Sequence, residues 1–104
     1  MSAIEFKDDD DEYYRWLGDN PQGFVVNTPR HKPSNNMVLH RASCKHIREP
    51  SRETHPGGFT ERAYIKVCAS NIEALRDWAA QHGRADRSFS IECSFCEPTG
   101  NHQA

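Results

Sequence analysis

The motif Cys93-Ser-Phe-Cys96 constrains this chain more than any other feature of its sequence. Two thiolates separated by two residues can bend through a tight turn and face one cation, with sulfur–zinc distances of about 2.3 Å. The same spacing occurs in redox pairs, but there it normally opens a helix after a strand. Here Pro98 and Gly100 follow almost at once, so the motif favours a zinc ion over a redox pair.

The short length of the chain indicates that a bound metal ion would help to stabilise its fold. A chain of 104 residues forms one domain with little stability to spare. Its apolar runs are far shorter than the roughly 18 residues that span a bilayer, and its first residues lack the basic start and apolar centre of a signal peptide. We therefore expect a cytoplasmic protein without membrane contact, whose four cysteines are reduced and available to a metal ion.

An earlier apolar run carries residues that can complete the zinc site. Residues 37–42 predict a strand, and His40 and Cys44 follow the spacing H-x3-C at its end. If the strand ends at His40 and the chain turns before Cys44, the two side chains supply the second half of a tetrahedral site. His46 is a competing ligand, although residues two apart in a helical turn point in roughly opposite directions. Cys68 lies within a predicted strand, where we expect a packed thiol.

The first part of the chain predicts a helix followed by a strand. Apolar side chains recur at i, i+3 and i+4 in Tyr13, Trp16 and Leu17. This spacing indicates a short leader helix with one aromatic face. The acidic run 8–11 lies at its N-terminus, where the helix dipole favours negative charge, so we interpret the run as a helix start. Residues 23–28 predict a strand that pairs antiparallel with residues 37–42.

The later part of the chain predicts a strand, a second helix and a last strand. Residues 62–70 alternate between the two faces as a half-buried strand does. Ser70 and Glu73 have the spacing of a capping box, and Gly83 ends the helix that they begin. The apolar stripe of this helix consists of Ile72, Leu75, Trp78, Ala79 and His82. Residues 87–93 predict the last strand.

These elements predict an α+β fold: a small, mostly antiparallel sheet with two flanking helices, stapled by one zinc ion. Residues 1–104 form a single zinc-binding domain on this interpretation. Residues 1–36 are its leader helix and first strand, residues 37–97 its metal-binding core, and residues 98–104 a disordered tail. Residues 48–60 are rich in proline and glycine, which predicts an exposed, mobile loop.

The order of these motifs resembles the metal-binding module of the Ada family of bacterial DNA-repair proteins, in particular stand-alone, actinobacterial-type relatives of that module. The matching segments, which run from Val38 to Cys96, are VLHRASCKHI, AYIKV, SNIEALRDWAAQHG and CSFC. The family pattern is Cys or His, three residues, Cys, a strand, a helix that ends at Gly, and Cys-x2-Cys. The resemblance implies a small mixed sheet with flanking helices, and zinc on His40, Cys44, Cys93 and Cys96.

One ligand position departs from the repair protein. There the first of the four ligands is a cysteine that takes a methyl group from a DNA phosphotriester, and the corresponding residue here is His40. An imidazole is not a comparable thiolate nucleophile, so we expect no alkyl transfer. Four protein ligands also leave no open position for water on a zinc ion, and neither a Ser/His/Asp set nor paired carboxylates stand out. We expect a protein that is not an enzyme.

Charge is unevenly distributed along the chain, whose net charge is only −2. Residues 1–19 hold seven acidic residues, whereas residues 28–52 are basic. The basic segment is either a solvated surface or a surface that faces anions. On the second interpretation its contacts to DNA phosphates come from Arg30, Lys32, Arg41, Lys45 and Arg48.

Two functions compete on this sequence. The first is a zinc-stabilised binding module that contacts DNA through its basic surface without catalysis. The alternative is a protein-interaction or regulatory accessory protein in which zinc is purely structural. In that case a protein partner meets the leader helix or the acidic run.

Overall fold

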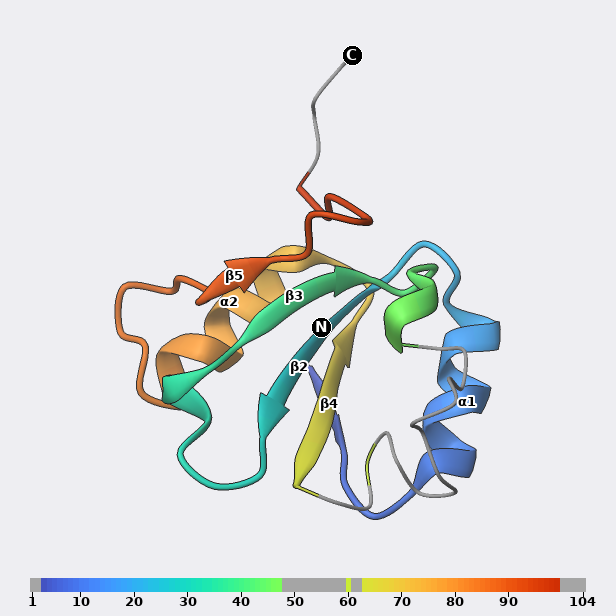
Figure 1. Ribbon diagram of the computed structural model, residues 1–104, viewed down its shortest axis with the longest axis horizontal. Coiled ribbons are helices and arrows are strands. Elements are labelled where there is room, and N and C mark those ends of the chain that lie inside the picture. Colours follow the sequence, from blue (N-terminus) through green and yellow to red (C-terminus); the bar gives the residue numbers. More distant parts are fainter. Residues whose placement is uncertain (1–2, 48–59, 61–62, 100–104) are drawn as a thin grey trace.

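The computed structural model describes residues 3–47, 60 and 63–99. Within them, strands form one sheet in the order β1-β4-β2-β3-β5, and two helices pack against it (Figure 1). The elements are β1 (Ile4–Phe6), α1 (Asp10–Asp19), β2 (Phe24–Pro29), β3 (Val38–Arg41), β4 (Tyr64–Ala69), α2 (Ile72–Gln81) and β5 (Ile91–Glu92). Every neighbouring pair is antiparallel except β3 and β5, which are parallel. The α+β fold class and the antiparallel pairing of β2 with β3 are confirmed.

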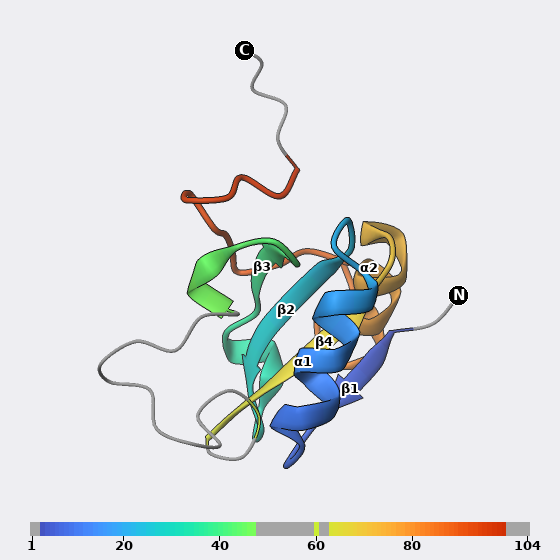
Figure 2. The same ribbon diagram turned by 90° about the vertical axis from the view of Figure 1, so that its right-hand side faces the viewer.

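The two helices cover opposite faces of the sheet (Figure 2). Successive residues of a strand point to opposite faces, so the neighbours Val25 and Val26 on β2 enter different cores. Val26 packs in a cluster with Leu75 and other buried residues of α2. Val25 packs in a second cluster with Tyr13 and other residues of α1. The central strands β2 and β4 are therefore covered on both sides.

The acidic run begins α1, as the sequence predicts. The Asp9 side chain accepts a hydrogen bond from the amide of Glu12 at 3.1 Å and caps the helix. Asp10 is buried, and its carboxylate accepts from both the amide (2.7 Å) and the hydroxyl (2.6 Å) of Thr60. Thr60 is itself completely buried, so the prediction of an exposed loop is wrong at this residue. The rest of that loop, residues 48–59, lies outside the described residues.

The second helix starts one residue later than the capping box predicts. The cap is Asn71, whose side-chain oxygen accepts from the amide of Ala74 at 2.9 Å. Ser70 is therefore not the cap, and Glu73 lies too early in the helix to complete a box. Instead Glu73 forms an ion pair with Arg87 at 3.0 Å. The apolar stripe is confirmed at Leu75, Trp78 and Ala79, which are buried, and Ile72 packs partly buried against the same cluster. Ala74 is buried as well, whereas His82 is only partly buried.

The strand predicted at residues 62–70 is buried on both faces rather than on one. β4 lies between β1 and β2, and α1 covers the face that the alternation left to solvent. Cys68 is completely buried there, and Lys66 is only 4% exposed. Burial lowers the pKa of Lys66 to about 8 because it disfavours the charged ammonium group. Within β4 itself, only Tyr64, its first residue, is exposed.

The ends of the sheet differ from the prediction in two ways. The last strand is only Ile91–Glu92, and Arg87, where the predicted strand begins, adopts a left-handed conformation (φ 64°) that a strand does not allow. The sequence did not predict β1, whose three residues are too few to show a pattern. Thr99, in the predicted tail, is placed with its hydroxyl donating to the carboxylate of Glu92. Residues 100–104 lie outside the described residues.

Candidate metal centre

The parallel pair of β3 and β5 brings two distant segments together. His40 lies on β3 opposite Val25 of β2, on the face of the sheet that α1 covers. Beside it, β5 pairs with β3, and the amide of Cys93 donates to the carbonyl of Leu39 at 2.9 Å. The ladder therefore continues one residue past Glu92 and delivers Cys93 next to the strand that carries His40.

A tight turn after β3 positions Cys44. Its amide donates to the carbonyl of Arg41 at 3.0 Å, and its own carbonyl accepts from the amide of Ile47 at 3.2 Å. The second bond opens a short 3-10 helix, η2 (Lys45–Ile47). The hydroxyl of Tyr13 on α1 donates to the carbonyl of Ile47 at 2.6 Å. The turn is thus fixed to β3 at one end and to α1 at the other.

The Cys-x2-Cys segment closes into a turn that Arg41 holds from outside. The amide of Glu97 donates to the carbonyl of Cys93 at 2.9 Å, which curls the chain so that Cys96 returns toward β3. The Arg41 amide then donates to the Cys96 sulfur at 3.2 Å, and the Arg41 Nε donates to the Cys96 carbonyl at 2.8 Å. A third bond runs from Arg41 Nη2 to the Glu97 carbonyl at 2.9 Å. Donors of this kind orient a sulfur ligand from outside the coordination shell.

These elements gather all four residues that the sequence proposes as ligands. The ligand atoms of His40, Cys44, Cys93 and Cys96 all lie within 4.8 Å of one another. The sulfurs of Cys44 and Cys93 are 4.0 Å apart, close to the edge of about 3.8 Å that a tetrahedron with 2.3 Å arms requires. The buried Nδ1 atom of His40 has no hydrogen-bond partner among the described residues. The donor set, its spacing and this orphaned nitrogen fit a metal ion.

The protonation of the cluster without a cation also fits this interpretation. Burial lowers the pKa of His40 to about 4, so its imidazole is neutral at pH 7 and offers a lone pair. Burial raises the pKa of the Cys44 thiol to about 12, and that of Cys96 also above its ordinary value. The pKa of Cys93 is lowered although burial opposes this, because the amides of Cys96 and Phe95 donate to its sulfur. A coordinated cation would hold all three sulfurs as thiolates.

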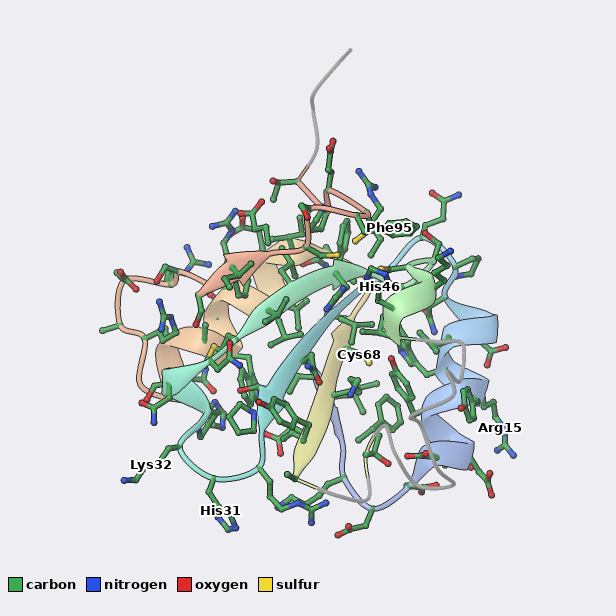
Figure 3. All side chains as sticks on the ribbon, viewed as in Figure 1. Arg15, His31, Lys32, His46, Cys68 and Phe95 are labelled. Atoms are coloured by element: carbon green, nitrogen blue, oxygen red, sulfur yellow. The ribbon has the colours of Figure 1, made fainter. Side chains whose placement is uncertain are left out.

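The other two candidate ligands lie outside this cluster. His46 is exposed on η2, and its ring centroid is 4.6 Å from that of Phe95. Cys68 is completely buried in the core under α1, opposite Val25 (Figure 3). It has the packed role that the sequence predicts, and burial raises the pKa of its thiol.

Substituting each histidine separates these roles. His40→Ala is expected to weaken metal affinity by more than the roughly 10- to 100-fold that loss of an outer-shell partner costs, because a direct ligand is lost. His46→Ala should leave metal content and melting temperature nearly unchanged. The measurement is a competition titration with a chromogenic chelator, together with thermal melting of both variants. The opposite ranking would move the site to Cys44 and His46.

The five basic residues proposed for phosphate contact do not form one surface. Arg30 forms a bidentate ion pair with Asp8 at 2.9 and 3.1 Å. Lys32 is exposed in the connection between β2 and β3, far from the metal-binding end of β3 that His46 marks (Figure 3). Arg41 and Lys45 flank the turn that carries Cys44. The sequence did not predict the hydrogen bonds from Arg41 to the Cys-x2-Cys turn. Arg48 lies outside the described residues.

Comparison of this chain with known proteins finds no match. No family model, curated protein or solved structure matches it. The resemblance to the Ada module therefore stays a prediction that rests on the motifs. In the part of the chain that the structure describes, neither helix has the length and apolar character needed to cross a membrane.

Proposed function

We propose that this protein is a zinc-stabilised, non-catalytic module that binds DNA through the basic surface beside its metal centre. The observation that carries the proposal is the convergence of His40, Cys44, Cys93 and Cys96. One imidazole and three thiolates are a donor set typical of structural zinc, whereas magnesium and calcium prefer oxygen ligands. Bound there, the ion would cross-link β3, the turn after it and the end of β5.

The number and burial of the donors support a structural role for the ion. A catalytic zinc keeps one position for water or substrate, and four protein donors would fill a tetrahedral shell. Three of the donors, His40, Cys44 and Cys93, are also buried. The ion would therefore contribute to the free energy of folding rather than to a reaction.

The DNA-binding part of the proposal rests on a smaller surface than the sequence indicates. Arg41 and Lys45 lie on the turn that carries Cys44, with the exposed Ser43 between them. Two nitrogens of the Arg41 guanidinium donate to carbonyls of the Cys-x2-Cys turn, which orients the group. Because the net charge of the chain is −2, attraction to phosphate has to be local and easily screened.

A charge reversal at Lys45 tests this surface. Lys45→Glu is expected to weaken binding to DNA and to reduce by about one the slope of log affinity against log salt, because one phosphate contact is lost. Lys32→Glu is the matched control, since Lys32 is equally charged but lies near the opposite end of β3. Fluorescence anisotropy at several salt concentrations measures both, with zinc content checked in each variant. Equal weakening by the two reversals would contradict the proposed surface.

A second candidate function remains, a protein partner that meets the leader helix α1. Tyr14 is 39% exposed there, among the acidic residues Asp11 and Glu12. Tyr13, by contrast, is completely buried, so a partner cannot contact its side chain. This accessory function predicts no DNA binding at moderate salt, and a partner that is lost in Tyr14→Ala.

A further inference from the structure

An exposed aromatic ring stands between the two cysteines of the Cys-x2-Cys turn. Phe95 is 56% exposed, although a side chain of its size and hydrophobicity would ordinarily be turned into the core. The backbone beneath it is held on both sides, by the bond from Glu97 to Cys93 and by the bonds from Arg41 to Cys96 and Glu97. The ring is therefore presented to solvent from a fixed turn.

Side chains from one neighbouring element frame this ring. The His46 ring contacts the Phe95 ring, with centroids 4.6 Å apart and planes tilted by 36°. The Lys45 ammonium nitrogen lies 5.2 Å from the Phe95 centroid. Figure 3 shows His46 and Phe95 side by side at one edge of the molecule. Both contacts come from η2, and Phe95 is still 56% exposed beside them. We call Phe95, His46 and Lys45 the aromatic platform.

A polar hollow adjoins the platform through Arg41. It has a volume of about 280 Å³ and is lined by Pro21, Gln22, Gly23, Arg41 and Ser43. Arg41 lines this hollow, and its guanidinium donates to the carbonyls of Cys96 and Glu97 in the turn that carries Phe95. Flat apolar surface and fixed positive charge thus lie next to each other.

We propose that the aromatic platform binds an unpaired base of single-stranded nucleic acid, whose neighbouring phosphates contact Lys45 and Arg41. This inference rests on the proposed function and names the form of nucleic acid. Every base has a π-face that can stack on an exposed aromatic ring, whereas in a duplex those faces are covered by neighbouring base pairs. The positive charges of Lys45 and Arg41 complement the phosphates that flank the base.

The charge around the ring favours this ligand over an apolar peptide. A peptide would gain from burial of Phe95 but would leave two cations, Lys45 and Arg41, facing apolar groups, which is unfavourable without a counter-charge. A nucleotide strand can stack a base on the Phe95 ring and place phosphates beside the two cations at the same time.

The test compares one backbone with and without bases. The probes are a labelled oligothymidylate of about 12 nucleotides, an abasic strand of the same length, and a blunt duplex, at one salt concentration. The oligothymidylate should bind more tightly than either of the others. Phe95→Leu should weaken its binding about 5- to 150-fold, the loss of stacking on one aromatic residue, while Phe95→Trp should retain it. Zinc content and melting temperature of both variants should match the unmodified protein.

Tyr64→Leu is the matched control, since Tyr64 is an exposed aromatic residue at the far end of β4. It should leave oligothymidylate binding unchanged. If the abasic strand binds as tightly as oligothymidylate and Phe95→Leu has no effect, while Lys45→Glu still weakens binding, the inference is overturned and the proposed function stands. If no probe binds, both fail, and a peptide becomes the occupant to consider for Phe95.

Discussion

Removing the metal ion with a chelator is expected to unfold this protein at neutral pH. Structural zinc contributes about 10–16 kcal/mol of apparent binding free energy in small zinc peptides, whereas a domain of this size has a net stability of about 5–15 kcal/mol. Without the ion, the three sulfurs and the orphaned His40 nitrogen remain crowded and largely buried without a common partner. Circular dichroism and thermal melting with and without chelator should show the loss, and elemental analysis should give one zinc per chain.

Two cysteine substitutions make this expectation specific. Cys93→Ala should abolish stoichiometric zinc and lower the melting temperature steeply, because it removes a ligand. Cys68→Ala should keep one zinc per chain, since Cys68 lies outside the cluster and its loss leaves only a small cavity, at a cost of about 1 kcal/mol. A metal-free protein that melts at the same temperature as the zinc-loaded protein would contradict the structural role of the ion.

Loss of the Tyr13 side chain is expected to have the next largest effect. Tyr13→Ala should lower the free energy of unfolding by about 3–5 kcal/mol, because a completely buried aromatic ring is removed from the core under α1. Tyr13→Phe should cost about 1–3 kcal/mol, because it leaves the carbonyl of Ile47 without its 2.6 Å hydrogen bond. Urea denaturation of the zinc-loaded protein measures both.

The adjacent tyrosine serves as the control for this pair. Tyr14 is 39% exposed, so Tyr14→Ala should change the free energy of unfolding by only about 0.5 kcal/mol. Since Ile47 ends the 3-10 helix that follows Cys44, Tyr13→Ala should also weaken metal affinity, whereas Tyr14→Ala should not. Equal destabilisation by the two alanine substitutions would show that the packing of α1 differs from the one described.

The sequence predicted those features that depend on short spacings. H-x3-C and Cys-x2-Cys each bring two donors to one side of a turn. Because structural zinc takes four ligands, these two pairs could be assigned to one site although they lie far apart in the sequence. Alternation and helical periodicity likewise indicated β2, β3, β4 and both helices. The same reasoning placed the N-cap of α2 wrongly at Ser70, because the side chains of Ser70 and Asn71 are both good N-caps and the spacing to Glu73 favoured Ser70.

The features that the sequence missed depend on contacts between distant segments. The alternation of residues 62–70 assigned Lys66 to the solvent face, yet Lys66 is buried on the face that α1 covers. Its burial depends on how the leader helix folds back on the sheet. The sequence predicted Arg30 as a phosphate contact, but Arg30 forms an ion pair with Asp8, which lies 22 residues away in the sequence. Arg41 looked like the same kind of residue, but its guanidinium also holds the Cys-x2-Cys turn, by a hydrogen bond to the Cys96 carbonyl at a separation of 55 residues. Proximity in sequence therefore gave no guide to which cations share a surface.

The pairing of β5 with β3 has a consequence for the order of events during synthesis. The sulfurs of Cys44 and Cys93 are separated by 49 residues, so a nascent chain that ends before Cys93 offers only two of the four donors. Joining them closes a loop whose entropy, by analogy with a disulfide loop, costs about 4 kcal/mol. A zinc ion held by two donors would bind too weakly to offset this loop-closure cost, whereas four donors could offset it. On the proposed function, metal capture by all four donors would therefore be a late step, in which the ion would lock β5 onto a sheet whose other strands have already left the ribosome.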